Sequence, residues 1–220
     1  IIAASSPVDC FYAAFETARF ALEHMTPAIL LTDGYIGFGS ELFQIPKMDD
    51  LPAIVPPIAA PNSDYKPYRR DENTLARQWA IPGTEGLRHR IGGLEKTDVF
   101  GQVSTDAQNH EKMTYLRNEK VMRIAERLPE QEIFGEPEGD LLVVSWGGTR
   151  GFVRSAVEKL QKEGKKVGHA HFRYIMPLPK NTRQVLSAYK KVVVAELNAG
   201  QFVKYLRDRK STRLNSSHRT

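Results

Sequence analysis

The sequence has very little cysteine, no long hydrophobic run and no signal peptide at its start. The single cysteine among 220 residues, Cys10, excludes an internal disulfide and leaves too few thiolates for an iron–sulfur cluster. No apolar run approaches the ~20 residues that a membrane-spanning helix needs, and no charged segment followed by an apolar one opens the chain. We therefore predict a cytoplasmic protein with no membrane partner.

Acidic residues are absent from the last part of the chain, which explains the net charge of +5. Residues 209–220 hold four basic residues, so the remainder has 27 basic (31 − 4) and 26 acidic residues, a net charge of +1. Because a nucleic-acid footprint should cover a folded face, we predict no nucleic-acid partner. The same residues have almost no apolar content, which predicts a disordered tail. Their sequence resembles read-through of a sequencing adapter, so we interpret 209–220 as non-native, with a genuine disordered tail as the alternative.

The chain also lacks an initiating methionine. Residues 1–4 have the small and β-branched character of a buried strand, and a domain rarely begins with a core strand that has no partner before it. We therefore expect a piece of a larger protein that was cut at its start. A processed or clipped product is the alternative.

Residues 1–46 have the pattern of a strand, a helix and a second strand. Asp9 is a plausible cap of the helix, and apolar residues then recur at helical spacing up to Leu22. A short buried strand follows at 27–33. A crossover of this length between two strands implies that they are parallel.

Residues 47–137 are predicted to be an irregular wrapping segment followed by a long helix. Prolines between Pro52 and Pro67 forbid a regular helix there, and so long an irregular segment in a compact protein usually covers a neighbour or serves a site. Thr105 and Gln108 stand at the positions of a capping box. They predict the start of an amphipathic helix, which Pro129 stops.

Residues 138–208 show the clearest alternation of strands and helices. Buried strands at 140–145, 166–172 and 191–196 alternate with helical segments, of which the last begins near Gly200. This order predicts an α/β domain with a parallel, doubly wound sheet.

Three polar residues, Asp33, Glu196 and Asn198, follow predicted strand ends. In an open parallel sheet the carboxyl ends of the strands face the ligand crevice, so these side chains are candidates for contact with a cofactor, a substrate or a partner subunit. In the alternative interpretation, Glu196 and Asn198 cap the last helix, and Asp33 forms a turn.

Residues 138–208 also contain a pair of glycines and a pair of histidines. Gly148 and Gly151 form half of a dinucleotide fingerprint, but Trp146 replaces its first glycine, so a stand-alone nucleotide-binding regulatory module is only the alternative function. His169 and His171 share one face of a strand, yet no third ligand is evident, and we predict no metal site. No set of residues assembles a nucleophile, a base and an orienting group.

A series of specific phrases follows in order along the chain: SPVDCF at 6–11, LTD at 31–33, PGTEG at 82–86, GLE at 93–95, STDAQNH at 104–110, WGGTRG at 146–151, YIMPLP at 174–179 and ELNAGQ at 196–201. Together these phrases resemble the alpha subunit of 2-oxoacid:ferredoxin oxidoreductases, particularly those that act on 2-oxoglutarate. The similarity runs from residue 1 to about 208.

The resemblance implies that residues 1–46 are the end of a thiamine-pyrimidine-binding domain and that 138–208 are a transketolase-C-like domain. It implies oxidative decarboxylation of a 2-oxoacid with thiamine diphosphate and coenzyme A, with electrons passing to ferredoxin. A beta subunit is expected to carry magnesium and a 4Fe–4S cluster, which agrees with the single cysteine here. The cofactor supplies the carbanion chemistry, and the protein positions it.

The sequence departs from the family pattern in two respects. The stretch resembling Tyr-Pro-Ile-Thr-Pro and the acidic residue that activates thiamine are expected upstream, and neither is in this chain. We therefore assign no catalytic residue and expect the chain to be inactive alone. Gly148 stands where the family often has serine, which we interpret as a mild change.

Overall fold

A computed structural model describes the backbone of residues 1–211 and the side chains of residues 1–208. The chain forms two compact units. The first unit comprises Ile1–Ala13, Leu30–Leu42 and the chain from Leu128 onwards, and the second comprises Ala14–Ile29 and Phe43–Arg127. The last helix, α6 (Gln201–Ser211), extends past the predicted boundary at 208. The rest of the expected tail lies outside the described residues.

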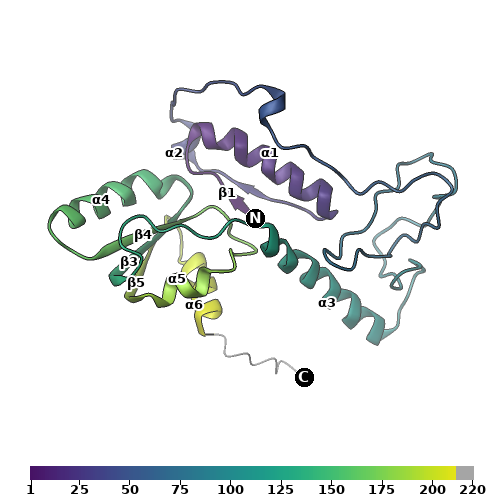
Figure 1. The fold of residues 1–220 in the computed structure, drawn as a ribbon. Coiled ribbons are helices and arrows are strands. Elements are labelled where there is room, and N and C mark those ends of the chain that lie inside the picture. The colour runs from purple at the N-terminus through teal and green to yellow at the C-terminus, as the bar shows by residue number, and fades with distance from the viewer. Residues whose placement is uncertain (212–220) are drawn as a thin grey trace. The chain divides into compact units, whose positions relative to one another are not determined.

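The core of the first unit is a parallel three-stranded sheet in the order β4-β3-β5 (Figure 1). The central strand β3 (Gly139–Trp146) pairs with β4 (Val167–Phe172) and β5 (Tyr189–Ala195). The crossovers contain α4 (Arg150–Lys162) and α5 (Thr182–Ser187). The predicted α/β class with a parallel sheet is therefore confirmed.

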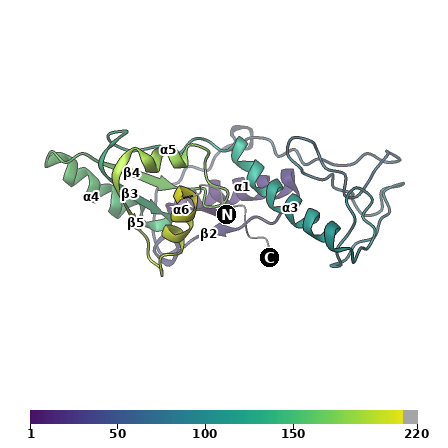
Figure 2. The same cartoon turned by 90° about the horizontal axis from the view of Figure 1, so that it is seen from below.

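Alternation along β3 buries a different apolar cluster on each face of this sheet. Leu142 and Val144 pack with residues of α5 and α6, whereas Leu141 and Val143 pack with α4. Figures 1 and 2 show α4 on one side of the sheet and α5 and α6 on the other. Full burial of a leucine or valine side chain contributes about 1.5–3 kcal/mol, so these two clusters hold the domain together.

A second, two-stranded sheet lies in the same unit. β1 (Ile2–Ala3) pairs in parallel with β2 (Leu30–Leu31), as predicted. On its other side β1 bonds to the segment after β4, because the Ala3 amide donates to the Arg173 carbonyl at 2.8 Å. The short helix α2 (Gly34–Gly37) follows β2.

Helix α1 (Pro7–His24) begins with a capping box rather than with the predicted Asp9 cap. Ser6 Oγ accepts from the Asp9 amide at 3.2 Å, and the Asp9 carboxylate accepts from the Ser5 amide at 2.8 Å. Pro7 then occupies the first helical position, where its missing N–H costs nothing. The prediction placed the cap three residues late because serine and aspartate are both good capping residues.

The second unit contains α3 (Ala107–Arg123), which continues as the 3₁₀ helix η2 (Ile124–Arg127). The cap is Asp106, whose carboxylate accepts from the Asn109 amide at 2.7 Å, so the prediction of a Thr105 cap was wrong by one residue. Aspartate outcompetes the neighbouring threonine because its charge also interacts favourably with the helix dipole.

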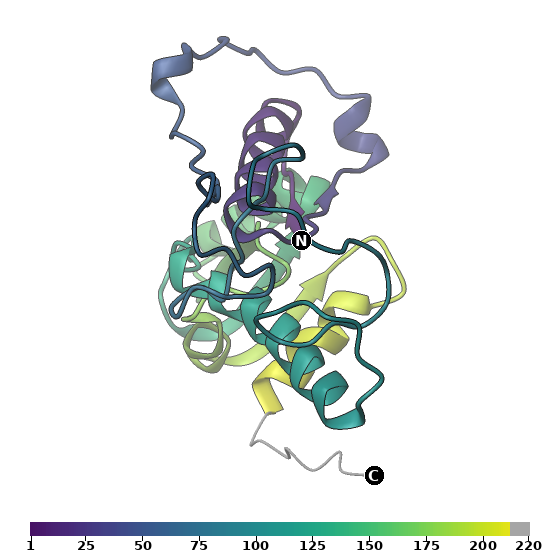
Figure 3. The ribbon, with the colours of Figure 1, turned by 90° about the vertical axis from the view of Figure 1, so that its right-hand side faces the viewer.

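The segment before α3 is irregular, as predicted. Its described elements are the 3₁₀ helix η1 (Met48–Asp50) and isolated β-bridges, and Figure 3 shows long loops over most of it. Trp79 Nε1 donates to the Leu22 carbonyl at 2.7 Å and so ties the segment to α1. Val55 and Ile58 are 71% and 51% exposed. These two side chains face solvent, and the covering role of the segment stays a prediction.

Candidate functional site

Asp33, which follows β2, contacts the glycine turn after β3, at the carboxyl edge of the three-stranded sheet. The Asp33 carboxylate accepts from the Ile36 amide at 3.0 Å, which caps α2, and from the Gly148 amide at 2.9 Å. A Cβ on Gly148 would lie 2.5 Å from Asp33 Oδ2. A side chain at position 148 would therefore push the Asp33 carboxylate away from the Gly148 amide.

The same contact bears on nucleotide binding at this turn. A phosphate bound at a helix start needs free backbone N–H groups and no nearby negative charge. Here the Gly148 N–H already donates to the Asp33 carboxylate. The turn consequently joins two chain segments. Gly148 allows the close approach of Asp33, whereas a Cβ on Gly151 would meet no atom within 4 Å.

Glu196 and Asn198 both cap α6, which confirms the alternative interpretation of these residues. Glu196 accepts from the amides of Val203 at 3.0 Å and Phe202 at 3.1 Å. Asn198 Oδ1 accepts from the Gly200 amide at 2.8 Å and, more weakly, from the first amide of α6, that of Gln201, at 3.4 Å. Burial raises the pKa of Glu196, but the two backbone hydrogen bonds and those from the Asn198 and Trp146 side chains together outweigh it, and the pKa is lowered overall. Contact of Asp33, Glu196 or Asn198 with a cofactor or a partner subunit stays a prediction.

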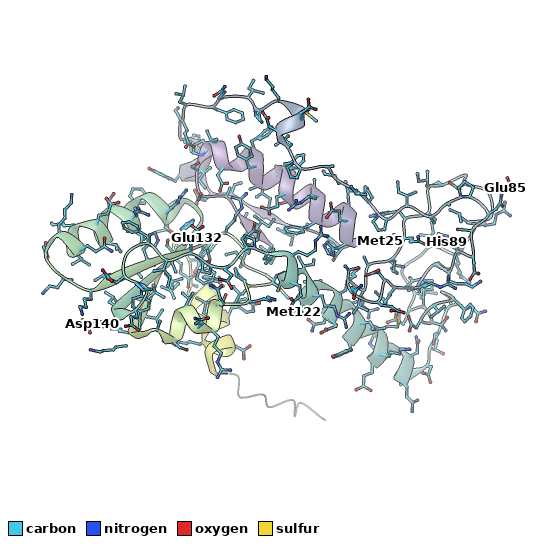
Figure 4. The ribbon with its side chains drawn as sticks, viewed as in Figure 1. Met25, Glu85, His89, Met122, Glu132 and Asp140 are labelled. Atoms are coloured by element: carbon cyan, nitrogen blue, oxygen red, sulfur yellow. The ribbon has the colours of Figure 1, made fainter. Side chains whose placement is uncertain are left out.

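A cavity of about 470 Å³ opens on the α4 side of the sheet. Its charged lining comes from the start of α1, from α4 and from the end of β4, and Glu132, labelled in Figure 4, lies on its wall. The Asp9 carboxylate pairs with Arg173, and Arg154 pairs with Glu158 at 2.8 Å. Burial raises the pKa of Asp9, but the hydrogen bond and charge of Arg173 and the hydrogen bonds from Ser5 together outweigh it, so the pKa is lowered overall and this carboxylate is ionised at neutral pH.

Two histidines of β4 share a serine hydroxyl in the wall of this cavity. Ser145 Oγ lies 2.7 Å from His169 Nε2 and 2.8 Å from His171 Nδ1. Burial and neighbouring positive charge lower the pKa of His169 to about 4 and that of His171 to about 3. Both rings are therefore neutral at pH 7. One hydroxyl can donate to one ring and accept from the other, which satisfies both nitrogens.

This arrangement suits orientation and hydrogen bonding rather than nucleophilic or metal chemistry. Ser145 is fully buried, so a ligand in the cavity cannot reach its hydroxyl. Within residues 1–208, no group of three or more histidine, cysteine or acidic residues is placed to hold a metal ion. The shared face of His169 and His171 was visible in the sequence, but Ser145 was missed because it lies on another strand.

Two family models match the chain over most of its length. Pyruvate flavodoxin/ferredoxin oxidoreductase, thiamine diphosphate-binding, matches residues 1–109, and pyruvate:ferredoxin oxidoreductase core domain II matches residues 139–218. The chain therefore belongs to the 2-oxoacid:ferredoxin oxidoreductase family, and the resemblance seen in the sequence is confirmed.

Individual relatives refine this assignment. The chain is 46% identical to the 2-oxoglutarate oxidoreductase subunit KorA of Mycobacterium tuberculosis, over 94% of this chain and 32% of the relative. It is 29% identical to the alpha subunit of 2-oxoacid:ferredoxin oxidoreductase 2 of Aeropyrum pernix, over 99% of this chain and 34% of the relative. The chain thus spans about a third of the length of these relatives.

A solved structure gives the same result for the fold. The 2-oxoglutarate:ferredoxin oxidoreductase of Magnetococcus marinus, with 2-oxoglutarate, coenzyme A and succinyl-CoA bound, superimposes with a TM-score of 0.87 at 28% identity. The alignment covers 96% of this chain and 37% of that chain. No helix among the described residues is long and apolar enough to cross a membrane.

The described residues do not form a thiamine diphosphate site by themselves. The carboxylates nearest the strands of residues 1–46 are already used: Asp9 binds Arg173 and Ser5, and Asp33 binds two backbone amides. Neither is free to receive the proton of a cofactor ring. No reaction step through this cofactor is therefore assigned to residues of this chain.

Proposed function

We propose that this chain is part of the alpha subunit of a thiamine diphosphate-dependent 2-oxoglutarate:ferredoxin oxidoreductase. Such an enzyme oxidatively decarboxylates the 2-oxoacid, transfers the acyl group to coenzyme A and passes the two electrons to ferredoxin. The observation that supports this proposal is the 46% identity with a 2-oxoglutarate oxidoreductase subunit over 94% of the chain. The expected site of action is the cytoplasm.

In this proposal the chain supplies framework rather than the reacting groups. The relatives are about three times as long as the aligned segment, so other parts of the subunit have room to supply the thiamine-activating carboxylate. A beta subunit would bring magnesium and the 4Fe–4S cluster, because the single cysteine here cannot.

Exposed apolar side chains support the presence of partner subunits. Phe38 and Leu42 in the first unit are 96% and 99% exposed, and Ile45 and Met48 in the second unit also face solvent. Several large apolar side chains exposed within so short a stretch are typical of interaction surfaces.

The proposal is tested with a hybrid subunit. The aligned segment of the Mycobacterium tuberculosis KorA protein is replaced by residues 1–208 of this chain, and the hybrid is produced with the relative's beta subunit. We expect reduction of ferredoxin or a viologen dye that requires both 2-oxoglutarate and coenzyme A, with pyruvate a poorer substrate. A subunit with the segment deleted serves as the control.

Two outcomes would contradict the proposal. One is steady 2-oxoglutarate-dependent dye reduction by the isolated 220-residue chain. The other is a hybrid that assembles with the beta subunit and binds its cofactors but does not turn over any 2-oxoacid. Turnover of pyruvate in preference to 2-oxoglutarate would overturn the substrate and keep the reaction class.

A further inference from the structure

The second unit contains a cavity of about 620 Å³ with a strongly positive lining. Four cationic side chains and one carboxylate, Glu95, line it, which gives a net charge of +3 (4 − 1) with neutral histidine. The cations are Arg70, Arg77, Arg117 and Lys120.

Two elements bring three of these cations together. Arg70 and Arg77 form an antiparallel bridge across a tight hairpin, which the Asp71 amide closes by donating to the Ala76 carbonyl at 2.8 Å. Like charges opposite one another on paired strands repel. Lys120 comes from α3 and is only 6% exposed.

These three cations have no carboxylate partner among the described residues. Arg70 and Arg77 each donate to one backbone carbonyl at 3.3 Å, and Lys120 Nζ donates to the Met25 carbonyl at 2.6 Å. Figure 4 labels Met25 and, on α3, Met122, two residues beyond Lys120. The Nε of Arg70 is buried with no hydrogen-bond partner.

The nearby carboxylates are paired elsewhere. Glu95 binds Arg117 at 3.1 Å and His110 at 2.9 Å, and Asp98 binds Lys112 at 2.8 Å. Burial and Arg77 lower the pKa of Arg70, and the charge of Asp98 raises it in part from outside hydrogen-bonding range. Arg70, Arg77 and Lys120 together therefore keep an excess of positive charge. Burying unpaired charge is costly, and a protein retains it where a ligand supplies the counter-charge.

The size of the charge indicates the class of ligand. A single carboxylate would neutralise only one of the three cations, whereas a diphosphate group carries enough charge and enough oxygens for all of them. Guanidinium groups bind phosphate oxygens in pairs, and an ammonium group adds a point charge. Arg77 is also held in place by the Tyr68 ring, 4.3 Å from its Cζ atom.

We propose that this cavity binds a phosphate-bearing ligand through Arg70, Arg77 and Lys120. The site depends on the charges of the second unit and not on the proposed reaction. Binding and turnover are measured separately, so failure of one is distinguishable from failure of the other. Burial and the two arginines lower the pKa of Lys120 to about 8, and a bound anion should raise it again.

The test is a calorimetric titration of the 220-residue chain with inorganic pyrophosphate near pH 7 and at low ionic strength, where surface charges are least screened. We expect saturable binding of one pyrophosphate per chain. Lys120→Met and Arg77→Gln should each weaken it about tenfold or more, because each removes a charge-assisted hydrogen bond. Arg88→Gln, an exposed arginine outside this cavity, is the matched control and should leave the affinity unchanged.

Trp79 fluorescence in a Trp146→Phe background, which reports on the second unit, checks that each variant is folded. Three results would overturn the inference: no saturable pyrophosphate binding, equal loss of affinity in the Arg88→Gln control, or tighter binding of 2-oxoglutarate than of pyrophosphate. The last result would make the cavity a carboxylate site. If Lys120→Met does not fold, Arg77→Gln alone decides the outcome.

Discussion

Protonated Lys120 should weaken the second unit near neutral pH, and its stability should rise in alkali. The ordinary pKa of lysine is 10.5, and burial together with Arg77 and Arg70 lowers the pKa of Lys120 in the folded chain to about 8. Between these values the unfolded chain binds more protons, so the free energy of unfolding increases with pH. At about 1.36 kcal/mol for each pH unit, the full increase is about 3 kcal/mol.

The assay isolates the second unit by fluorescence. The chain has two tryptophans, Trp79 in the second unit and Trp146 in the first, so Trp146→Phe leaves a reporter of the second unit alone. Urea unfolding of this variant is measured at several values between about pH 7 and 10, with and without Lys120→Met. One protein has the titrating lysine, and the other has a neutral methionine in its place. The difference between their free energies of unfolding removes the contribution of every other titrating group.

We expect the Lys120→Met protein to be the more stable one at pH 7 and the difference to shrink as the pH rises through 8. Lys47→Met, at an exposed position of the same unit, should show no such trend. Parallel stability curves for the Lys120 pair across this range would refute the reasoning. They would mean that the ammonium group is solvated in the folded chain.

Three further predictions concern the first unit, each read from Trp146 fluorescence in a Trp79→Phe background or by NMR. Gly148→Ala should cost about 1–3 kcal/mol through its collision with Asp33, and the cost should largely disappear when Asp33→Ala is also present. Additive effects would show that the two residues do not touch. Asn198→Ala should lower stability by about 1 kcal/mol through loss of the α6 cap, and an unchanged unfolding midpoint would contradict it. His169 and His171 should stay neutral down to about pH 4 and 3, respectively. Their contribution to the free energy of unfolding is therefore complete above pH 6.5 and falls as the pH drops below it. Ring proton shifts that titrate near 6.5 would exclude the buried pair.

The regular part of the fold was accessible from the sequence because its signals are local. The apolar run of β3 and the turn residues that follow it stand together in the chain, so strand, turn and helix could be predicted in order. Helix starts were less certain. At α1 and α3 several capping residues stand close together, and only the geometry shows that Ser6 and Asp106 are the caps.

The sites were less accessible because they join residues far apart in the chain. Asp33 meets Gly148 across 115 positions, and Ser145 meets His169 across 24. A single sequence contains no periodicity that reports such contacts. The capping roles of Glu196 and Asn198 were predictable as an alternative, since their partners lie within seven residues.

The two cavities differ in how they treat positive charge. In the first unit, Arg173 is neutralised by Asp9 and the histidines are held neutral. In the second unit, Glu95 and Asp98 compensate Arg117 and Lys112 on the exposed side of α3, while the more buried Lys120 has only a carbonyl. Selection for stability alone would place a carboxylate beside the buried cation first, because an unpaired charge costs most where water is excluded. Here the exposed cations have carboxylate partners and the buried lysine has none. This distribution argues that the charge around Lys120 is kept for a group from outside the chain.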